Sequence, residues 1–250
     1  MSDPGRRAGL ARGAAGGAGA GAGAGDGAGA GAGDGAGDGA RAGRTHRRTR
    51  IQEENRERIL AAALDVFASD GFRGATVDAI AEGAGMSKPN LLYYFSGKEE
   101  IYRTLLSGLL EVWLEPLEQL DPAGEPLAEI TTYVRRKLEM SAAYPRESRL
   151  FAGEMLRGAP VLGPVLGGRL RALVAQKAAV IEGWIAAGRL APHDPRHLIF
   201  AIWATTQHYA DFDVQVRSVL GVEPEDGGHL EEAGAFLGAL FLRGLAPERA

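Results

Sequence analysis

The 250-residue chain contains no cysteine and no apolar run near the ~18 residues that a membrane-spanning helix needs. Without cysteine, a disulfide scaffold, a thiolate metal site and a cysteine nucleophile are all excluded. The arginines near the N-terminus are followed by no apolar stretch, so no secretory signal is expected. These absences predict a soluble, cytoplasmic protein.

Large apolar side chains are also scarce in residues 1–43, which hold 17 of the 37 glycines. Such a segment cannot bury enough surface to offset the entropy lost on ordering it. Its G-x-G strings lack the preceding strand of a dinucleotide-binding loop, and its Gly-Asp pairs lack the apolar residue of calcium-binding repeats. We expect a disordered Gly/Ala-rich tail without chemistry, which leaves about 207 residues for folded domains.

Positive charge is concentrated in one short arm. Residues 41–50 carry five arginines and no acid, although the whole chain has a net charge of −4. A basic arm on an acidic body suits a protein that contacts a polyanion at one end. Within the arm, Arg47 and Arg48 are candidate DNA contacts. A solubilising linker is the alternative, and the arm alone does not decide between the two.

Beyond residue 50, the apolar residues repeat with helical period, and no segment alternates as a strand does. The first helix is predicted to end at Gly71, and Ser96 and Glu99 are predicted to form a capping box that opens a helix ending before Pro116. Further helices are expected over 76–83, 87–94, 126–143, 146–157, 166–187, 194–214 and 228–244. The predicted fold class is all-α.

The helices over 76–83 and 87–94 and the glycine-containing turn between them have the proportions of a helix-turn-helix. In this motif the second helix enters the major groove, where Asn90 can read a base edge and Lys88 can reach phosphate oxygens. Each side chain alone is more often an ordinary cap or a solvated group, but the set follows a basic arm and favours DNA. The candidate DNA-binding residues of the motif are Thr76, Ser87, Lys88, Pro89, Asn90, Tyr93, Tyr94 and Lys98.

The segment GFRGATVDAIAEGAGMSKPNLLYYFSGKEEIY resembles the N-terminal domain of TetR-family transcriptional regulators. The resemblance covers about residues 50–103. It implies a homodimer with a DNA-binding domain over 44–100 and a helical effector-binding and dimerisation domain over 101–250. It also implies that Thr76, Tyr94 and Lys98 contact phosphates and that the helix from Ser87 to Tyr93 reads bases.

Two tryptophans and a glutamine are candidates for a ligand pocket in the C-terminal part. Trp203 and Gln207 are four residues apart and share one helix face, so an indole stacking surface lies beside a carboxamide that pairs with a nucleobase edge. Trp113 is a candidate second stacking plate, and Thr206 and Tyr209 are nearby polar groups. Spacing alone favours ordinary core tryptophans.

The C-terminal part of the chain resembles that of pyrimidine-utilisation repressors in the same family. The segments that carry this resemblance are RLFAGEMLRGAP, EVWLEPL and KAAVIEGWIAAGRLAPHDPRHLIFAIWATTQHYADFDVQV. The resemblance implies uracil or thymine as the effector and pyrimidine catabolism genes as targets. Under this interpretation the two tryptophans line the effector pocket. The chain is then a regulator and not an enzyme.

Other interpretations remain open. One is a TetR-type regulator of another ligand, such as a lipophilic drug, and another is a helical enzyme or scaffold with a vestigial DNA-binding domain. No catalytic motif is present, and neither a cofactor nor a metal is expected, because His193, His197 and His208 lack a carboxylate repeat. The helices 194–214 and 228–244 are the expected dimer interface. Their apolar stripe is also compatible with intrachain core, and it comprises Leu230, Phe236, Leu237, Leu240 and Phe241.

Overall fold

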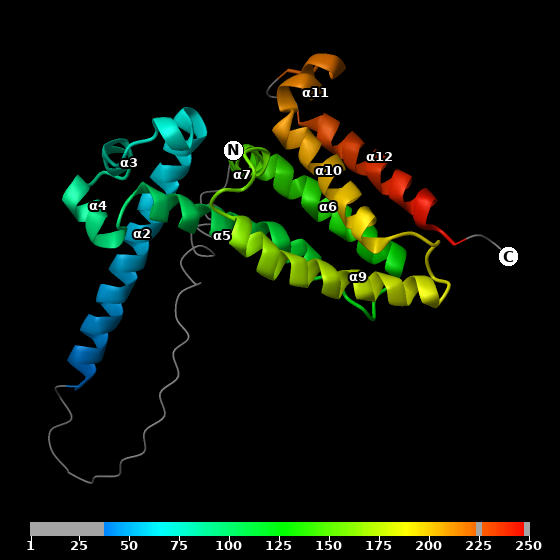
Figure 1. The fold of residues 1–250 in the computed structure, drawn as a ribbon, viewed down its shortest axis with the longest axis horizontal. Coiled ribbons are helices and arrows are strands. Elements are labelled where there is room, and N and C mark those ends of the chain that lie inside the picture. The colour runs from blue at the N-terminus through cyan, green and yellow to red at the C-terminus, as the bar shows by residue number, and fades with distance from the viewer. Residues whose placement is uncertain (1–37, 224–226, 248–250) are drawn as a thin grey trace, which may run out of the picture. The chain divides into compact units, whose positions relative to one another are not determined.

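Figure 1 shows the computed structural model, which describes residues 38–223 and 227–247, with side chains from Arg50 onward. All regular elements in this described part are helical, which confirms the all-α prediction. The chain divides into two compact units, the first ending at Gly108 and the second beginning at Leu109. No described helix is long and apolar enough to span a membrane.

The first unit contains α2 (Asp38–Gly74), α3 (Val77–Gly83), α4 (Lys88–Tyr94) and the start of α5 (Lys98–Glu118). Residues 1–37 of the expected tail lie outside the described residues. Residues 38–43 are helical, contrary to the expected tail, because alanine and arginine have high helix propensity and continue α2 towards the N-terminus. Gly71 interrupts α2 with a φ of 66°, as a glycine at a helix end does.

A small core holds the helices of the first unit together. Phe67 and Tyr102 are both 1% exposed, and their rings meet edge to face with centroids 4.9 Å apart. The fully buried Leu91 anchors α4. Gly83 allows α3 to approach α2 closely, because a Cβ there would lie 3.3 Å from the Ala62 Cβ.

The second unit is a helical bundle in which α6 packs against both α10 and α12 (Figure 1). Its core includes Leu117, Ile130, Ile181 and Ile202, all less than 3% exposed. The elements that follow α5 are α6 (Pro126–Ala143), α7 (Pro145–Leu156), α8 (Gly163–Val165), the π-helix η1 (Leu166–Leu170), α9 (Arg171–Ala186), α10 (Pro195–Asp211), α11 (Asp213–Leu220) and α12 (Gly228–Leu245).

Several details of the predicted helices were wrong. The helix expected over 194–214 is divided at Phe212 into α10 and α11. The carboxylate that accepts hydrogen bonds from the Ser96 N–H and hydroxyl belongs to Glu100, not Glu99, because α5 begins at Lys98. Pro116 lies inside α5 and does not end it, since the helix continues to bury Leu117. The helix expected over 166–187 opens with a π-helix that contains Gly167 and Gly168, which tolerate a widened turn because they lack a Cβ.

Candidate DNA-binding and effector sites

Two hydroxyl caps fix the helix-turn-helix of the first unit. Thr76 Oγ1 accepts a hydrogen bond from the Ala79 N–H at 3.1 Å, and Ser87 Oγ accepts one from the Asn90 N–H at 3.4 Å. Both caps match the prediction from the sequence. Between the helices, Gly85 adopts a φ of 65°, a left-handed conformation that side chains with a Cβ rarely adopt.

The candidate base-reading residues lie on the surface of α4. Ser87, Lys88, Pro89, Asn90 and Tyr93 are exposed, and Tyr93 is 66% exposed. Tyr93 combines an apolar ring with a polar hydroxyl, and on an exposed helix this combination suits contact with a sugar-phosphate backbone. Lys88 Nζ forms an ion pair with Asp78 Oδ2 at 2.9 Å, and with both side chains exposed this pair exchanges readily for a phosphate.

Side chains of α2 hold α4 in place, a role that the sequence analysis missed. Asn55 Nδ2 donates to the Tyr94 hydroxyl at 2.8 Å, and Arg56 Nη1 donates to the Tyr94 carbonyl at 2.9 Å. The Arg56 guanidinium also lies 4.2 Å from the centre of the Phe95 ring. Arg58 Nη2 donates to the Ala84 carbonyl of the turn at 2.5 Å. Asn55 and Arg56 lie one turn before the buried Ile59 and Leu60, on the same helix face, and this spacing was the available signal.

Lys98 occupies a different position from the one expected for a free phosphate contact. Its Nζ donates to the carbonyls of Phe72 and Ala75, each at 2.9 Å, and lies 4.9 Å from the centre of the Phe72 ring. The Phe72 carbonyl belongs to the last turn of α2 and the Ala75 carbonyl follows it, where carbonyls lack an intrahelical partner. The ammonium therefore has a structural role, and its contact with phosphate stays a prediction. The side chains of Arg47 and Arg48 lie outside the described residues.

In the second unit, Trp203 of α10 is tied to α6. Its Nε1 donates to the Tyr133 hydroxyl at 2.5 Å. Burial raises the pKa of the Tyr133 phenol, so the hydroxyl stays neutral and can accept this bond. The Trp203 ring lies 5.7 Å from Phe200 and Trp113 lies 6.3 Å from Tyr144, so the two indoles have separate ring partners within the described chain.

The remaining candidate pocket residues differ in whether their polar atoms are already hydrogen-bonded within the protein. The Thr206 hydroxyl is fully buried and donates to the Ile202 carbonyl at 2.7 Å inside its own helix, so it is not available to a ligand. Gln207 is half-buried, and its carboxamide forms no hydrogen bond within the described part of the chain. Tyr209 is half-buried and lines a surface pocket of about 250 Å³ with Val216 and Val219. Gln207 and Tyr209 therefore have polar atoms that form no hydrogen bond among the described residues, and Gln207 offers both a donor and an acceptor.

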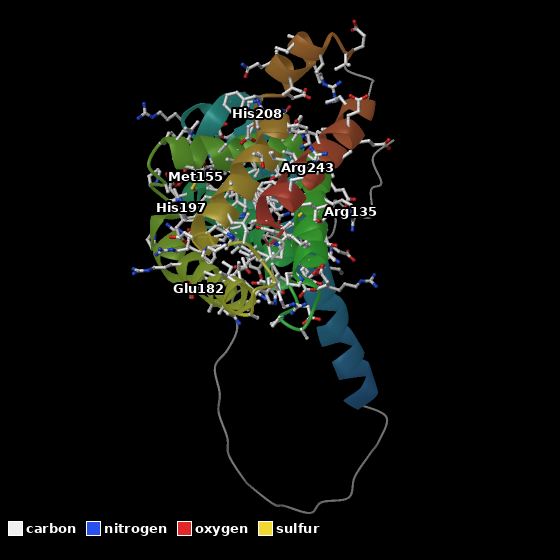
Figure 2. The ribbon with its side chains drawn as sticks, turned by 90° about the vertical axis from the view of Figure 1, so that its right-hand side faces the viewer. Arg135, Met155, Glu182, His197, His208 and Arg243 are labelled. Carbon is white, nitrogen blue, oxygen red and sulfur yellow. The ribbon has the colours of Figure 1, made fainter. Side chains whose placement is uncertain are left out.

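Three histidines were weighed as metal ligands in the sequence, namely His193, His197 and His208. No group of three or more metal-ligating side chains occurs among the described residues. His197 and His208 lie on α10 (Figure 2), eleven residues and therefore roughly 16 Å apart along the helix axis. His193 Nδ1 is paired with the Ala191 carbonyl at 2.8 Å.

A capped helix-turn-helix with an exposed second helix, joined to a separate helical bundle, defines a DNA-binding transcriptional regulator. The profile "Bacterial regulatory proteins, tetR family" matches residues 59–105, and the profile "YcdC-like protein, C-terminal region" matches residues 106–248. The chain belongs to the TetR family of bacterial regulators.

Among its relatives is the HTH-type transcriptional regulator RutR of Escherichia coli K12, which is 47% identical over 203 residues, covering 81% of this chain and 96% of RutR. A transcriptional regulator from Streptomyces coelicolor has a similar structure, with a TM-score of 0.63, 26% identity and coverage of 78% of this chain and 99% of that one. The ketosteroid transcriptional regulator KstR2 of Mycobacterium tuberculosis gives a TM-score of 0.61 at 23% identity, and the match covers 76% of this chain and 94% of KstR2. The family profile and the 47% identical RutR show that the chain is a transcriptional regulator rather than an enzyme.

Proposed function

We propose that the protein is a cytoplasmic, homodimeric repressor of pyrimidine catabolism genes that uracil or thymine releases from its operator. The observation that carries the effector assignment is Gln207, whose free, half-buried carboxamide lies one helical turn from the Trp203 indole. A carboxamide presents a donor beside an acceptor, which complements an N–H and C=O edge of uracil. The resemblance over residues 149–160 and 177–216 to pyrimidine-utilisation repressors supports the same assignment.

The mechanism follows from linkage between two sites. In the dimer, two α4 helices contact the half-sites of a two-fold-symmetric operator, and the arginines of 41–50 add salt-dependent attraction. Effector binding in the second unit favours a dimer geometry whose half-site spacing no longer fits DNA. Operator DNA must then weaken effector binding by the same factor. A coupling free energy of about 2–3 kcal/mol, roughly 30- to 150-fold, is sufficient.

The proposed dimer interface lies on α10 and α12. Phe236 is 62% and Leu240 is 50% exposed on α12, and Phe200 is 48% exposed on α10. Leu237 was included in the predicted stripe, but it is 3% exposed and belongs to the intrachain core. The outward residues of α10 and α12 therefore supply an apolar surface of the kind that a homodimer buries.

Two measurements test the proposal. A gel shift with DNA from upstream of the protein's own gene should show a specific complex at moderate salt, and added uracil should dissociate it. Calorimetry with uracil should show saturable binding to one site per chain. Specific DNA binding without any uracil response would mean that the effector belongs to another chemical class. Binding without sequence preference would overturn the repressor assignment.

Replacing Gln207 tests the pocket directly. Gln207→Leu should lose the uracil response while operator affinity stays within about twofold of the wild type, because the carboxamide contacts only the effector. Gln176→Leu on α9 is the matched control, since Gln176 is exposed and the side-chain change is the same. Loss of operator binding together with the uracil response would make Gln207 structural.

A further inference from the structure

An ion pair joins α3 and α4, the two short helices of the helix-turn-helix (Figure 1). Lys88 Nζ of α4 donates to Asp78 Oδ2 of α3 at 2.9 Å, across the turn between the helices. The side chain of Lys88 is 49% exposed and that of Asp78 is 67% exposed. Because water screens an ion pair at such exposure, the pair adds little to the stability of the fold. Its position on the surface of the motif points to a role in DNA binding.

Helix electrostatics do not favour a lysine at position 88. Lys88 is the first residue of α4, directly after the Ser87 cap, and the free N–H groups at the start of a helix repel a cation. Asp78, in the first turn of α3, is by contrast at a position that favours a carboxylate. The N-terminal residues of a recognition helix are the ones that contact base edges. A function in DNA recognition therefore accounts for Lys88 better than a role in the helix does.

The carboxylate of Asp78 has a cost for DNA binding. DNA phosphates are negative, so an exposed acid bonded to a DNA-facing lysine cancels much of the attraction that the lysine supplies. Two other polar side chains of α4 are held by neutral amides: the Tyr93 hydroxyl accepts from Gln52 at 3.4 Å, and the Tyr94 hydroxyl accepts from Asn55 at 2.8 Å. These contacts position side chains without adding negative charge. Positioning alone therefore does not explain a carboxylate at position 78.

We propose that Asp78 is a specificity-determining residue, which holds the Lys88 ammonium for a base contact and weakens binding to DNA that offers only phosphates. An ammonium has three N–H donors, and Asp78 accepts from one of them. The other two can donate to O6 and N7 of a guanine, the paired major-groove acceptors that a lysine contacts. This inference rests on DNA binding by α4 and does not depend on the effector.

Operator DNA and unrelated DNA use the ion pair differently. On the operator, Lys88 keeps its bond to Asp78 while its two remaining donors face a base. On unrelated DNA, binding consists of phosphate contacts, and Lys88 must exchange Asp78 for a phosphate oxygen. Asp78 is then left unpaired beside a polyanion, so the exchange gains little free energy. The pair therefore disfavours non-specific binding more than operator binding.

Gel shifts with the full chain test the assignment, using Asp78→Asn, DNA from upstream of the protein's own gene and an unrelated duplex at one salt concentration. Affinity for the unrelated duplex should rise about 3- to 10-fold, because two exposed ion pairs per dimer no longer have to be broken, while operator affinity stays within about twofold. Glu82→Gln is the matched control, since Glu82 is exposed on the same helix and the same charge is removed. An unchanged ratio of the two affinities in Asp78→Asn, or an equal fall in Glu82→Gln, would overturn the inference.

Salt dependence separates this role of Asp78 from a purely structural one. The Asp78–Lys88 pair carries no net charge, whereas Lys88 without Asp78 neutralises one phosphate and releases its counterion. For the unrelated duplex, the slope of log K against the logarithm of the salt concentration should therefore steepen by up to about 0.9 per chain in Asp78→Asn. A slope equal to that of the wild type would contradict the inference, because Lys88 would then gain no phosphate contact.

A double mutant shows whether Asp78 acts through Lys88. In the Lys88→Met background, Asp78→Asn should no longer change the ratio of operator affinity to unrelated-duplex affinity. An equal change in both backgrounds would mean that Asp78 repels DNA directly, and the inference would fail. If the wild-type chain shows no preference for the operator, the repressor assignment and this inference fail together. A wild-type preference that Asp78→Asn leaves intact rejects this inference alone.

Discussion

At the scale of single residues, the helix-turn-helix is positioned by cations that do not need DNA. Arg56 and Arg58 of α2 donate to carbonyls of α4 and of the turn, and Lys98 donates to carbonyls that follow Gly71. Each of these cations donates to a backbone carbonyl, and Arg56 and Lys98 also lie over aromatic rings, so the charge stabilises the fold before it meets a phosphate. The DNA-binding surface is thus partly organised by its own positive charges.

Replacing Lys98 should affect stability as well as DNA binding. Lys98→Met leaves the carbonyls of Phe72 and Ala75 without their donor, and we expect the free energy of unfolding of the first unit to fall by about 1–3 kcal/mol. Urea denaturation followed by circular dichroism measures this change. An unaltered midpoint would show that water replaces the ammonium at no cost.

Tyr94→Phe is the complementary change, because it removes a hydroxyl together with the hydrogen bond that Asn55 donates to it. It should weaken DNA binding about equally for all sequences, since a phosphate contact carries no base information. Gel shifts with the operator and with an unrelated duplex measure this effect. The affinity for uracil should not change. A loss confined to the operator would mean that Tyr94 reads a base and not the backbone.

At the scale of elements, the turn between α3 and α4 depends on one backbone conformation. Gly85 has a φ of 65°, and a Cβ there would lie 3.3 Å from Arg58 Nη2, the group that donates to the Ala84 carbonyl. A side chain at position 85 would strain the backbone and would also disturb the hydrogen bond from Arg58, and both effects act on this turn. The relative orientation of α3 and α4 is therefore sensitive to this position.

Gly85→Ala should destabilise the first unit by about 1–2 kcal/mol and weaken operator binding, because an alanine at positive φ is strained. Gly183→Ala in the interior of α9 should have the opposite effect and stabilise the protein. No atom lies within 4 Å of a Cβ at Gly183, and alanine gains up to about 1 kcal/mol of helix propensity there. Denaturant midpoints of the two variants check both signs. A destabilised Gly183→Ala would contradict the helix-propensity argument.

The helix bounds show which sequence signals were sufficient. The caps Thr76, Ser87 and Asp194 were predicted, because a capping hydroxyl or carboxylate acts within three residues along the chain. The continuation of α5 past Pro116 could not be predicted. It depends on the distant Lys177, whose Nζ donates to the carbonyls of Glu118 and Leu120 at the end of that helix.

At the scale of the whole molecule, the proposed dimer depends on apolar side chains that the single chain leaves exposed. Phe236→Asp should convert the dimer to a monomer, because the change places a charge in the proposed interface. Sedimentation velocity should show the lower mass, with helicity unchanged since Phe236 is 62% exposed. Operator affinity should fall by at least 100-fold. A dimer that persists in this variant would place the interface elsewhere.

The sequence alone determined the helical class, the two caps of the helix-turn-helix and the family, because caps, periodicity and local motifs act over a few residues. Only the tertiary structure decided that the Lys98 ammonium serves backbone carbonyls, that the Thr206 hydroxyl is used within its own helix, and that the Trp203 N–H of α10 donates to the Tyr133 hydroxyl of α6. These facts depend on which helices pack together, and burial and electrostatic pairing between distant segments are properties of that packing.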